Sequence, residues 1–269
     1  MIRTQRETHG MAITSSTWDP AQYLKFSGER LRPALDLMAR VPLETAGHVV
    51  ELGCGAGNMT AILKQRFAAS DALGVDGAEP MLAKARATAP GCRFEVGDFN
   101  TWTPATPPDL LFTNAALHWV TGHETLFPRL IATLAPGGVL AVQMPSMHDA
   151  PLRRLQNEVA ARPEFAGHLG DPGHARDILS PGAYYDIVRP RVSALDIWET
   201  TYLHVLTGED AVVEWAAGSS LRPFLDRLPA GLVPRFRAAY ADALRPHYPR
   251  RADGTTLLPF KRFFLIARR

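Results

Sequence analysis

Residues 49–58 read Val49-Val50-Glu51-Leu52-Gly53-Cys54-Gly55-Ala56-Gly57-Asn58. An apolar run typical of a buried strand leads into three glycines at alternate positions, and a helix-forming stretch, Met59 to Phe67, follows them. Glycine lets the backbone turn sharply and approach a ligand with no Cβ in the way. The stretch therefore predicts a strand, a ligand-binding loop and a helix, which together begin an α/β fold.

Outward from this loop, short apolar runs alternate with helix-like stretches between Val41 and Val142. This alternation is typical of βαβ units that build a parallel sheet with helices on both faces. The expected strands are His48 to Leu52, Ala72 to Val75, Arg93 to Val96, Leu110 to Thr113 and Val139 to Gln143. The expected helices are Gly57 to Phe67, Glu79 to Thr88 and His123 to Leu134, the last ended by Ala135-Pro136-Gly137-Gly138.

The segments that flank this core are less regular. Pro20 to Ala39 carries apolar residues at helical spacing, and Pro33 is expected to divide it into two short helices. Residues 145–192 contain scattered proline and glycine around a helical patch at Arg153 to Arg162. We predict that they form an insertion, or lid, rather than a new sheet.

Two late β-like runs complete the expected sheet. Ser193 to Leu206 and Thr255 to Ala267 enclose helical stretches near Ala211 to Ala217 and Leu232 to Leu244. We expect the two runs to pair antiparallel and to close one sheet edge, which gives a mostly parallel sheet of seven strands. The predicted organisation is a frayed tail over 1–17 and a single domain over 18–269, with a core at 41–143, a lid at 145–192 and a C-terminal portion at 193–269.

Bulk composition excludes several classes of protein. The 269 residues are 46% hydrophobic, which allows a full core. No apolar run approaches the roughly 20 residues that cross a bilayer, and the polar N-terminal segment does not form a secretory signal. The net charge of +2 gives no electrostatic footprint for nucleic acid. Cys54 and Cys92 lack paired or metal-ligand spacing, so we expect free thiols, no metal and a cytoplasmic protein, with a monomer as the default.

An acidic residue ends the second predicted strand. Asp76, in Gly74-Val75-Asp76-Gly77, lies nineteen positions after Gly57, where a carboxylate accepts hydrogen bonds from ribose hydroxyls. Loops that bind a dinucleotide pyrophosphate read GxGxxG, whereas this loop reads GxGxG after Glu51. The acid supports nucleoside binding in general, and the glycine spacing argues against a dinucleotide.

The GxGxG loop after Glu51 resembles the cofactor loop of class I S-adenosylmethionine (SAM)-dependent methyltransferases. Three more segments match that family in the same order: Gly97-Asp98-Phe99, Asn114-Ala115 and Leu134 to Leu140. The resemblance implies a Rossmann-like class I methyltransferase fold, SAM as cofactor and S-adenosylhomocysteine as product. The cofactor-binding residues that it implies are Glu51, Gly53, Gly55, Gly57, Asp76, Gly77, Asp98, Phe99, Asn114, Ala115 and Trp119.

Segments outside these motifs resemble a narrower family, the trans-aconitate 2-methyltransferases. They are Trp18 to Pro33, Asn114 to Trp119, Gly137 to Pro145, Ala183 to Ile187, Leu221 to Pro223 and Phe260 to Arg268. This resemblance implies a methyl ester formed on one carboxylate of a small acid, first of all trans-aconitate. Ser146-Met147 and Ser219-Ser220 depart from the family pattern, and Pro163 to His174 shows no match.

The implied chemistry needs binding residues more than a catalytic base. A carboxylate is already ionised at pH 7, so alignment and exclusion of water suffice and no catalytic residue is predicted. Arginine is the best carboxylate partner. The candidate substrate-binding residues are Arg222, Tyr23, His118, Tyr184, Tyr185, Tyr202 and Arg262, with Arg222 first.

Several of these candidates have a structural alternative. Tyr184 and Tyr185 are equally well explained as packing aromatics. We favour a surface cation at Arg262 and a satisfied helix cap at His118. Trp119 is expected to form a hydrophobic wall against the cofactor.

Three other functions stay open on the sequence alone. The first is a SAM-dependent methyltransferase of another small molecule or of an acid on a carrier protein, for which Arg245, Arg250 and Arg251 would offer a docking face. The second is a nicotinamide-dependent oxidoreductase, against which the glycine spacing and Asp98-Phe99 argue. The third is a non-catalytic SAM-binding module, which would lack an acceptor cavity lined by cations.

Overall fold

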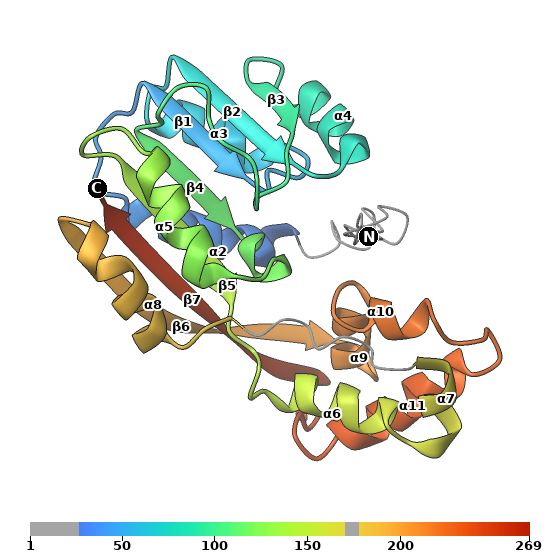
Figure 1. Cartoon of the computed structure of the whole chain (residues 1–269). Coiled ribbons are helices and arrows are strands. Elements are labelled where there is room, and N and C mark those ends of the chain that lie inside the picture. The colour runs from blue at the N-terminus through green and yellow to red at the C-terminus, as the bar shows by residue number, and fades with distance from the viewer. Residues whose placement is uncertain (1–26, 170–177) are drawn as a thin grey trace, which may run out of the picture.

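The protein is built on one seven-stranded sheet with the strand order β3-β2-β1-β4-β5-β7-β6 (Figure 1). A computed structural model describes residues 27–169 and 178–269. The strands are β1 (His48–Leu52), β2 (Asp71–Asp76), β3 (Arg93–Val96), β4 (Leu110–Asn114), β5 (Val139–Pro145), β6 (Ala194–Thr207) and β7 (Thr255–Arg268). Strands β1 to β5 are parallel, and β7 is antiparallel to both β5 and β6. The predicted fold class and the antiparallel edge are confirmed.

Helices cover both faces of the sheet. On one face, strand residues such as Leu111 and Leu140 pack against α5 (His123–Thr133) and α8 (Pro181–Val188). On the other face, Val49 and Phe112 pack against α2 (Ser27–Arg40) and α3 (Asn58–Arg66). The remaining elements are α4 (Glu79–Thr88), α6 (Pro151–Ala160), α7 (Pro163–Leu169), α9 (Ala211–Ala217), α10 (Arg222–Leu225), α11 (Val233–Leu244), η2 (Leu117–Trp119) and η3 (Arg189–Arg191).

Helix α2 continues through Pro33, so the predicted division at this residue is wrong. An internal proline removes one backbone hydrogen bond and costs a helix about 3 kcal/mol. Ala34 and Leu37 are fully buried and pack with residues of the central strands, and this burial offsets the cost. The part of the predicted segment before residue 27, and the predicted tail at 1–17, lie outside the described residues.

Two long strands carry a helical lobe beside the sheet. Strands β6 and β7 have 14 residues each, but β7 pairs with β5 only from Arg262 to Arg268. Beyond that segment the two strands pair with each other alone and reach the helices α6, α7, α9, α10 and α11 (Figure 1). These helices bury a separate apolar cluster around Trp215 and Phe236. We call residues 147–169 and 208–254 the helical lobe.

No helix within the described ranges is both long and apolar enough to pass through a membrane. Both cysteines are free thiols: Cys54 is buried in the glycine loop, and Cys92 is partly exposed before β3.

Candidate functional site

The glycine loop has a backbone that only glycine adopts easily. Gly53, Gly55 and Gly57 have φ values of 77°, 53° and 79°, in the left-handed region. A Cβ on Gly53 would lie 2.2 Å from the Cβ of Ala116, which is far inside contact distance. The Gly53 amide donates to the Val75 carbonyl at 2.8 Å. The loop is therefore held between β2 and the segment that follows β4.

Asp76, at the end of β2, ties the loop together from the other side. One carboxylate oxygen accepts a hydrogen bond from the Gly55 amide at 2.9 Å, and the other accepts one from the Ala78 amide at 2.9 Å. A carboxylate can accept about four hydrogen bonds. Two acceptor positions are thus left for a ligand such as a ribose.

The predicted adenine residues lie next to the same loop. The Cζ atom of Phe99 would be 3.5 Å from a Cβ on Gly53, so the ring borders the loop. A Cβ on Gly77 would be 3.9 Å from the carbonyl oxygen of Gly97, which brings the turns after β2 and β3 together. Asp98, between Gly97 and Phe99, has an exposed side chain. Residues from three strand ends therefore converge around the loop.

The segment after β4 completes this edge of the sheet. Ala115 has a φ of 52°, which is strained for a residue with a side chain, and its amide donates to the Gln143 carbonyl at 2.9 Å. The buried Oδ1 of Asn114 has no hydrogen-bond partner among the described residues. Trp119 is 46% exposed. A strained turn, a buried amide oxygen and an exposed ring thus occur within residues 114–119, the segment whose Ala116 borders the loop.

Glu51, on β1, supports the glycine loop through a contact with α3. Its side chain is only 3% exposed, and the Thr60 hydroxyl of α3 donates to its Oε2. Burial raises the pKa of Glu51 to about 8, and the nearby Asp76 carboxylate acts in the same direction. The carboxyl group is therefore protonated at neutral pH in the protein without ligand.

We expect the free energy of unfolding to fall as the pH rises from about 4.5, the ordinary pKa of Glu51, to about 8. In this range the folded protein holds a proton that the unfolded chain has lost, so the stabilisation is complete below 4.5 and is lost above 8. Urea unfolding between pH 4 and pH 9 measures the effect, with Glu51→Gln as the control. Parallel pH curves for the two proteins would contradict it.

His118 is held neutral by burial and by two arginines. Its buried Nδ1 has no hydrogen-bond partner among the described residues, so the helix-cap alternative is not supported. Burial lowers the pKa of His118 to about 3, and the positive charges of Arg262 and Arg153 lower it further. Two cations from different elements, β7 and α6, therefore act on one imidazole.

Arg262 is a buried residue, and its predicted placement on the surface is wrong. It is 5% exposed, and it lies on β7 between Pro145 of β5 and Thr200 of β6. Its guanidinium carbon lies 4.4 Å from the ring centre of Phe260. A buried arginine at the end of the parallel strands is suited to hold an anion.

Tyr202, on β6, lies near the same cation. Burial and its hydrogen bond to Asp36 of α2, at 2.7 Å, raise the pKa of Tyr202, and the charges of Arg32 and Arg262 partly oppose the shift. Its hydroxyl group stays protonated and is already a donor to Asp36.

The structure does not bring the other candidate substrate-binding residues together as clearly. Arg222 begins α10 in the helical lobe and pairs with Asp226 at 2.9 Å. Tyr185, 52% exposed, lies on α8, whose neighbour Tyr184 packs on the sheet face opposite to α2. Tyr23 lies outside the described residues. Arg153 was not among the sequence candidates, because its position depends on how α6 of the lobe packs.

Tyr184 has the environment of a packing residue. It is fully buried, and its ring centre lies 4.6 Å from that of Phe263 and 4.9 Å from that of Phe127. Its hydroxyl is 2.6 Å from Nδ1 of His123 and accepts a hydrogen bond from the Leu179 amide at 3.3 Å. These contacts favour the packing alternative over a substrate role.

Replacement of Tyr184 by phenylalanine should lower the free energy of unfolding by about 1–3 kcal/mol, because it leaves the buried Nδ1 of His123 without its hydrogen-bond partner. The KM of the acid substrate should not change. Urea unfolding and steady-state kinetics measure the two effects. A large rise in KM with an unchanged free energy of unfolding would instead favour a substrate-binding role for Tyr184.

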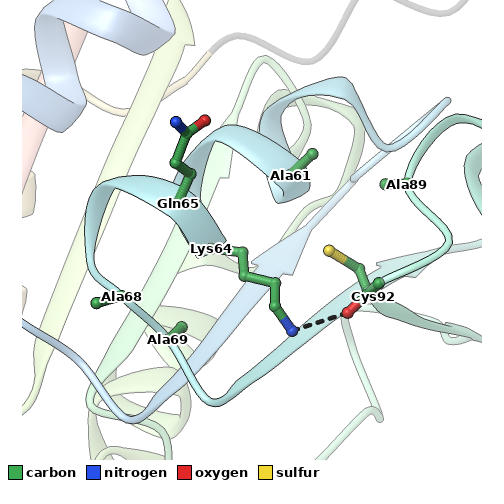
Figure 2. Close-up of a pocket in the computed structure, with 8 residues that line it drawn as sticks. Ala61, Lys64, Gln65, Ala68, Ala69, Ala89 and Cys92 are labelled. Carbon is green, nitrogen blue, oxygen red and sulfur yellow. Dashed lines mark hydrogen bonds between the residues drawn. The ribbon is translucent and has the colours of Figure 1, made fainter.

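A separate hollow of about 500 Å³ lies between α3 and the turn before β3 (Figure 2). Ala61, Lys64 and Cys92 are among its lining residues. The Lys64 ammonium already donates to the Gly91 carbonyl at 2.8 Å. The hollow is at the amino ends of the strands, on the opposite edge from the glycine loop, so we do not assign the cofactor to it.

Comparison with known proteins agrees with this geometry. Residues 49–138 match the family described as "Methyltransferase domain". The chain is 47% identical to the trans-aconitate 2-methyltransferase of Variovorax paradoxus (strain S110), over 94% of this chain and 98% of that protein. It is 49% identical to the trans-aconitate 2-methyltransferase of Methylobacterium nodulans, with the same coverage.

Solved structures show the same fold at low sequence identity. An S-adenosylmethionine dependent methyltransferase from Mesorhizobium loti superposes with a TM-score of 0.51 at 23% identity, over 91% of this chain and all of that one. The YcgJ protein from Bacillus gives a TM-score of 0.56 at 16% identity, over 88% and 97% of the two chains.

Proposed function

This chain belongs to the trans-aconitate 2-methyltransferase family, and we propose that it methylates one carboxylate of trans-aconitate, or of a closely similar acid, to a monomethyl ester. It is a SAM-dependent methyltransferase. The observation that carries the choice of an acid is the buried Arg262 on β7, which is 5% exposed and opposite Pro145 at the end of β5. Its charge and that of Arg153 also lower the pKa of His118, next to the end of β4. A site with two cations and a neutral imidazole favours a polyanion over a neutral acceptor.

The residues around the glycine loop fit SAM. The left-handed glycines leave room that a Cβ would fill, and Asp76 keeps two acceptor positions for ribose hydroxyls. We propose that Gly77, Asp98 and Phe99 hold the adenine side and that Asn114 and Ala115 lie beneath the methionyl group. SAM supplies a methyl group that its sulfonium charge makes electrophilic. Glu51 accepts a hydrogen bond from Thr60 of α3 and is proposed as a further cofactor-binding residue at the start of the loop.

The chain's own contribution to the reaction is to bind and align the acid. Arg262 and Arg153 would each hold a carboxylate, and neutral His118 adds a hydrogen bond without a further charge. Because the acid is already ionised, no residue needs to remove a proton. Arg222 and Tyr202 are proposed as further contacts, from the lobe and from β6, and Trp119 as a wall that excludes water.

We propose that residues 18–269 act as one domain, because β6 and β7 run through both the sheet and the helical lobe. A cytoplasmic location is supported by the two free thiols. The monomeric state and the lack of nucleic-acid binding are proposed on the small net charge of +2 and on the small size of the acid.

A carrier-linked acid is the alternative acceptor. The arginines that would form its docking face are largely engaged within the protein: Arg245 pairs with Asp242 and Asp210, and Arg250 donates to the Gly254 carbonyl at 3.2 Å. An exposed pair is worth little, but the arrangement gives no specific support to an acidic carrier.

The test is to incubate the protein with methyl-labelled SAM and trans-aconitate, cis-aconitate, citrate, isocitrate or itaconate, and to follow label into an extractable monomethyl ester. We expect the highest kcat/KM with trans-aconitate. If SAM binds and no acid is methylated, the acceptor assignment is wrong, and Ser146-Met147 and Ser219-Ser220 become the positions to examine.

A further inference from the structure

Gln143, on β5, carries a buried amide without a partner. It is fully buried, and neither Nε2 nor Oε1 has a hydrogen-bond partner among the described residues. Gln156 of α6 is almost as buried, but its Nε2 donates to the Ser220 hydroxyl at 2.7 Å. A buried amide that makes no hydrogen bond destabilises the folded chain. Such a group in a native protein calls for an explanation, and a ligand is one.

The strand register places this amide at the acceptor side of the site. Gln143 is opposite Asn114 of β4 and opposite Phe264 of β7. Arg262 lies two residues before Phe264 and therefore on the same face of the sheet. Diagonal neighbours in an antiparallel pair are within reach of long side chains. Asn114, Gln143 and Arg262 thus form a row across three adjacent strands, which we call the strand-end row.

The backbone of Gln143 is already part of the site. Its carbonyl oxygen accepts the Ala115 amide at 2.9 Å, which holds Ala115 at its positive φ. The side chain of Gln143 therefore lies between the segment proposed to support the cofactor's methionyl group and the buried cation of Arg262.

We propose that Nε2 of Gln143 donates a hydrogen bond to the oxygen that is not methylated in the reacting carboxylate. This inference rests on the proposed function. A neutral donor suits the position because a second cation there would repel the sulfonium. A donor on the other oxygen orients the carboxylate and leaves the attacking oxygen free. Arg262 then binds another carboxylate of the same acid.

The decisive variant is Gln143→Met, which keeps the length of the side chain and removes its polar atoms. We expect the KM for the acid to rise about tenfold or more, because a hydrogen bond to a charged group is lost. The Kd for SAM should stay within about twofold. The Tm of the SAM-free protein should rise, because an unpaired amide is replaced by an apolar group.

Gln156→Met is the matched control for the stability measurement. Its amide is paired, so the same substitution should lower the Tm. A structural role for Gln143 predicts a lower Tm in its variant as well. Opposite signs for the two variants are therefore a readout that packing alone would not give.

An unchanged kcat/KM for the acid, or a lower Tm of SAM-free Gln143→Met, overturns the assignment of Gln143 and leaves the proposed function intact. Wild-type protein that binds SAM and methylates no acid overturns the proposed function itself. The two failures are distinguished because the second is seen in the wild type alone.

Discussion

Arg262→Ala should reduce kcat/KM for the acid by about a hundredfold or more, while the Kd for SAM changes little. Arg262 is 5% exposed, in the middle of β7 and opposite the end of β5, so the interaction of its guanidinium with an anion is weakly screened. Removal of one partner of a buried charge pair costs about 2–5 kcal/mol or more. Steady-state kinetics with trans-aconitate and calorimetric titration with SAM separate the two quantities.

Two further variants make this result specific. Arg268→Ala removes an exposed arginine from the same strand, where it donates to the Gly137 carbonyl, and should leave kcat/KM unchanged. Arg262→Lys keeps the charge and loses the planar pair of donors, so it should restore part of the activity. In Arg262→Ala the pKa of His118 should rise, because one of the two cations that lower it is gone. An equal kcat/KM for Arg262→Ala and the wild type would show that Arg262 does not bind the acid.

Gly53→Ala should strongly reduce methyl transfer by weakening SAM binding. The added Cβ would lie 2.2 Å from the Cβ of Ala116, and the φ of 77° is itself unfavourable for alanine. Overpacking costs about 1–3 kcal/mol and a left-handed backbone about 1–2 kcal/mol. Relief of the clash requires the loop to move away from the segment after β4, so we expect the Kd for SAM to rise about a hundredfold.

Gly91→Ala is the matched control, because a Cβ at Gly91 meets no atom within 4 Å and its φ is outside the left-handed region. This variant should bind SAM as the wild type does. Circular dichroism and the Tm show whether Gly53→Ala is still folded. A folded Gly53→Ala protein with unchanged SAM affinity would show that the cofactor does not depend on this loop.

Local patterns predicted the regular elements well. The strand His48–Leu52 and the helix Glu79–Thr88 have the predicted bounds, because hydrophobic periodicity is a local property. Pro33 shows the limit of such rules. Its local effect on a helix is real, but the burial of Ala34 and Leu37 in the assembled protein outweighs it.

The edge of the sheet that carries the glycine loop could likewise be predicted from the sequence. Each of its parts follows the end of a parallel strand, and the carboxyl ends of parallel strands meet at one edge. The sequence alone therefore groups the glycines with Asp76, and the structure joins them through the hydrogen bond from Gly55.

The acceptor side of the site could not be predicted from the sequence, because its residues come from elements that only tertiary packing brings together. Arg262 reads locally as a surface cation, and only the assembled protein, in which β7 lies between β5 and β6, shows that it is buried. Arg153 depends on the packing of the helical lobe. Gln143 reads as one polar residue in an apolar strand, and only the tertiary structure shows that its amide is buried with no hydrogen-bond partner among the described residues.

The sequence by itself thus determined the parallel core, the antiparallel edge and the loop that suits SAM, since short-range patterns and strand order specify them. The tertiary structure alone decided which cations lie near His118 and which candidate, Tyr184, is a core residue. The physical reason is that burial and charge depend on neighbours distant in the chain, and these shift the pKa of His118 and hold the Arg262 guanidinium away from water.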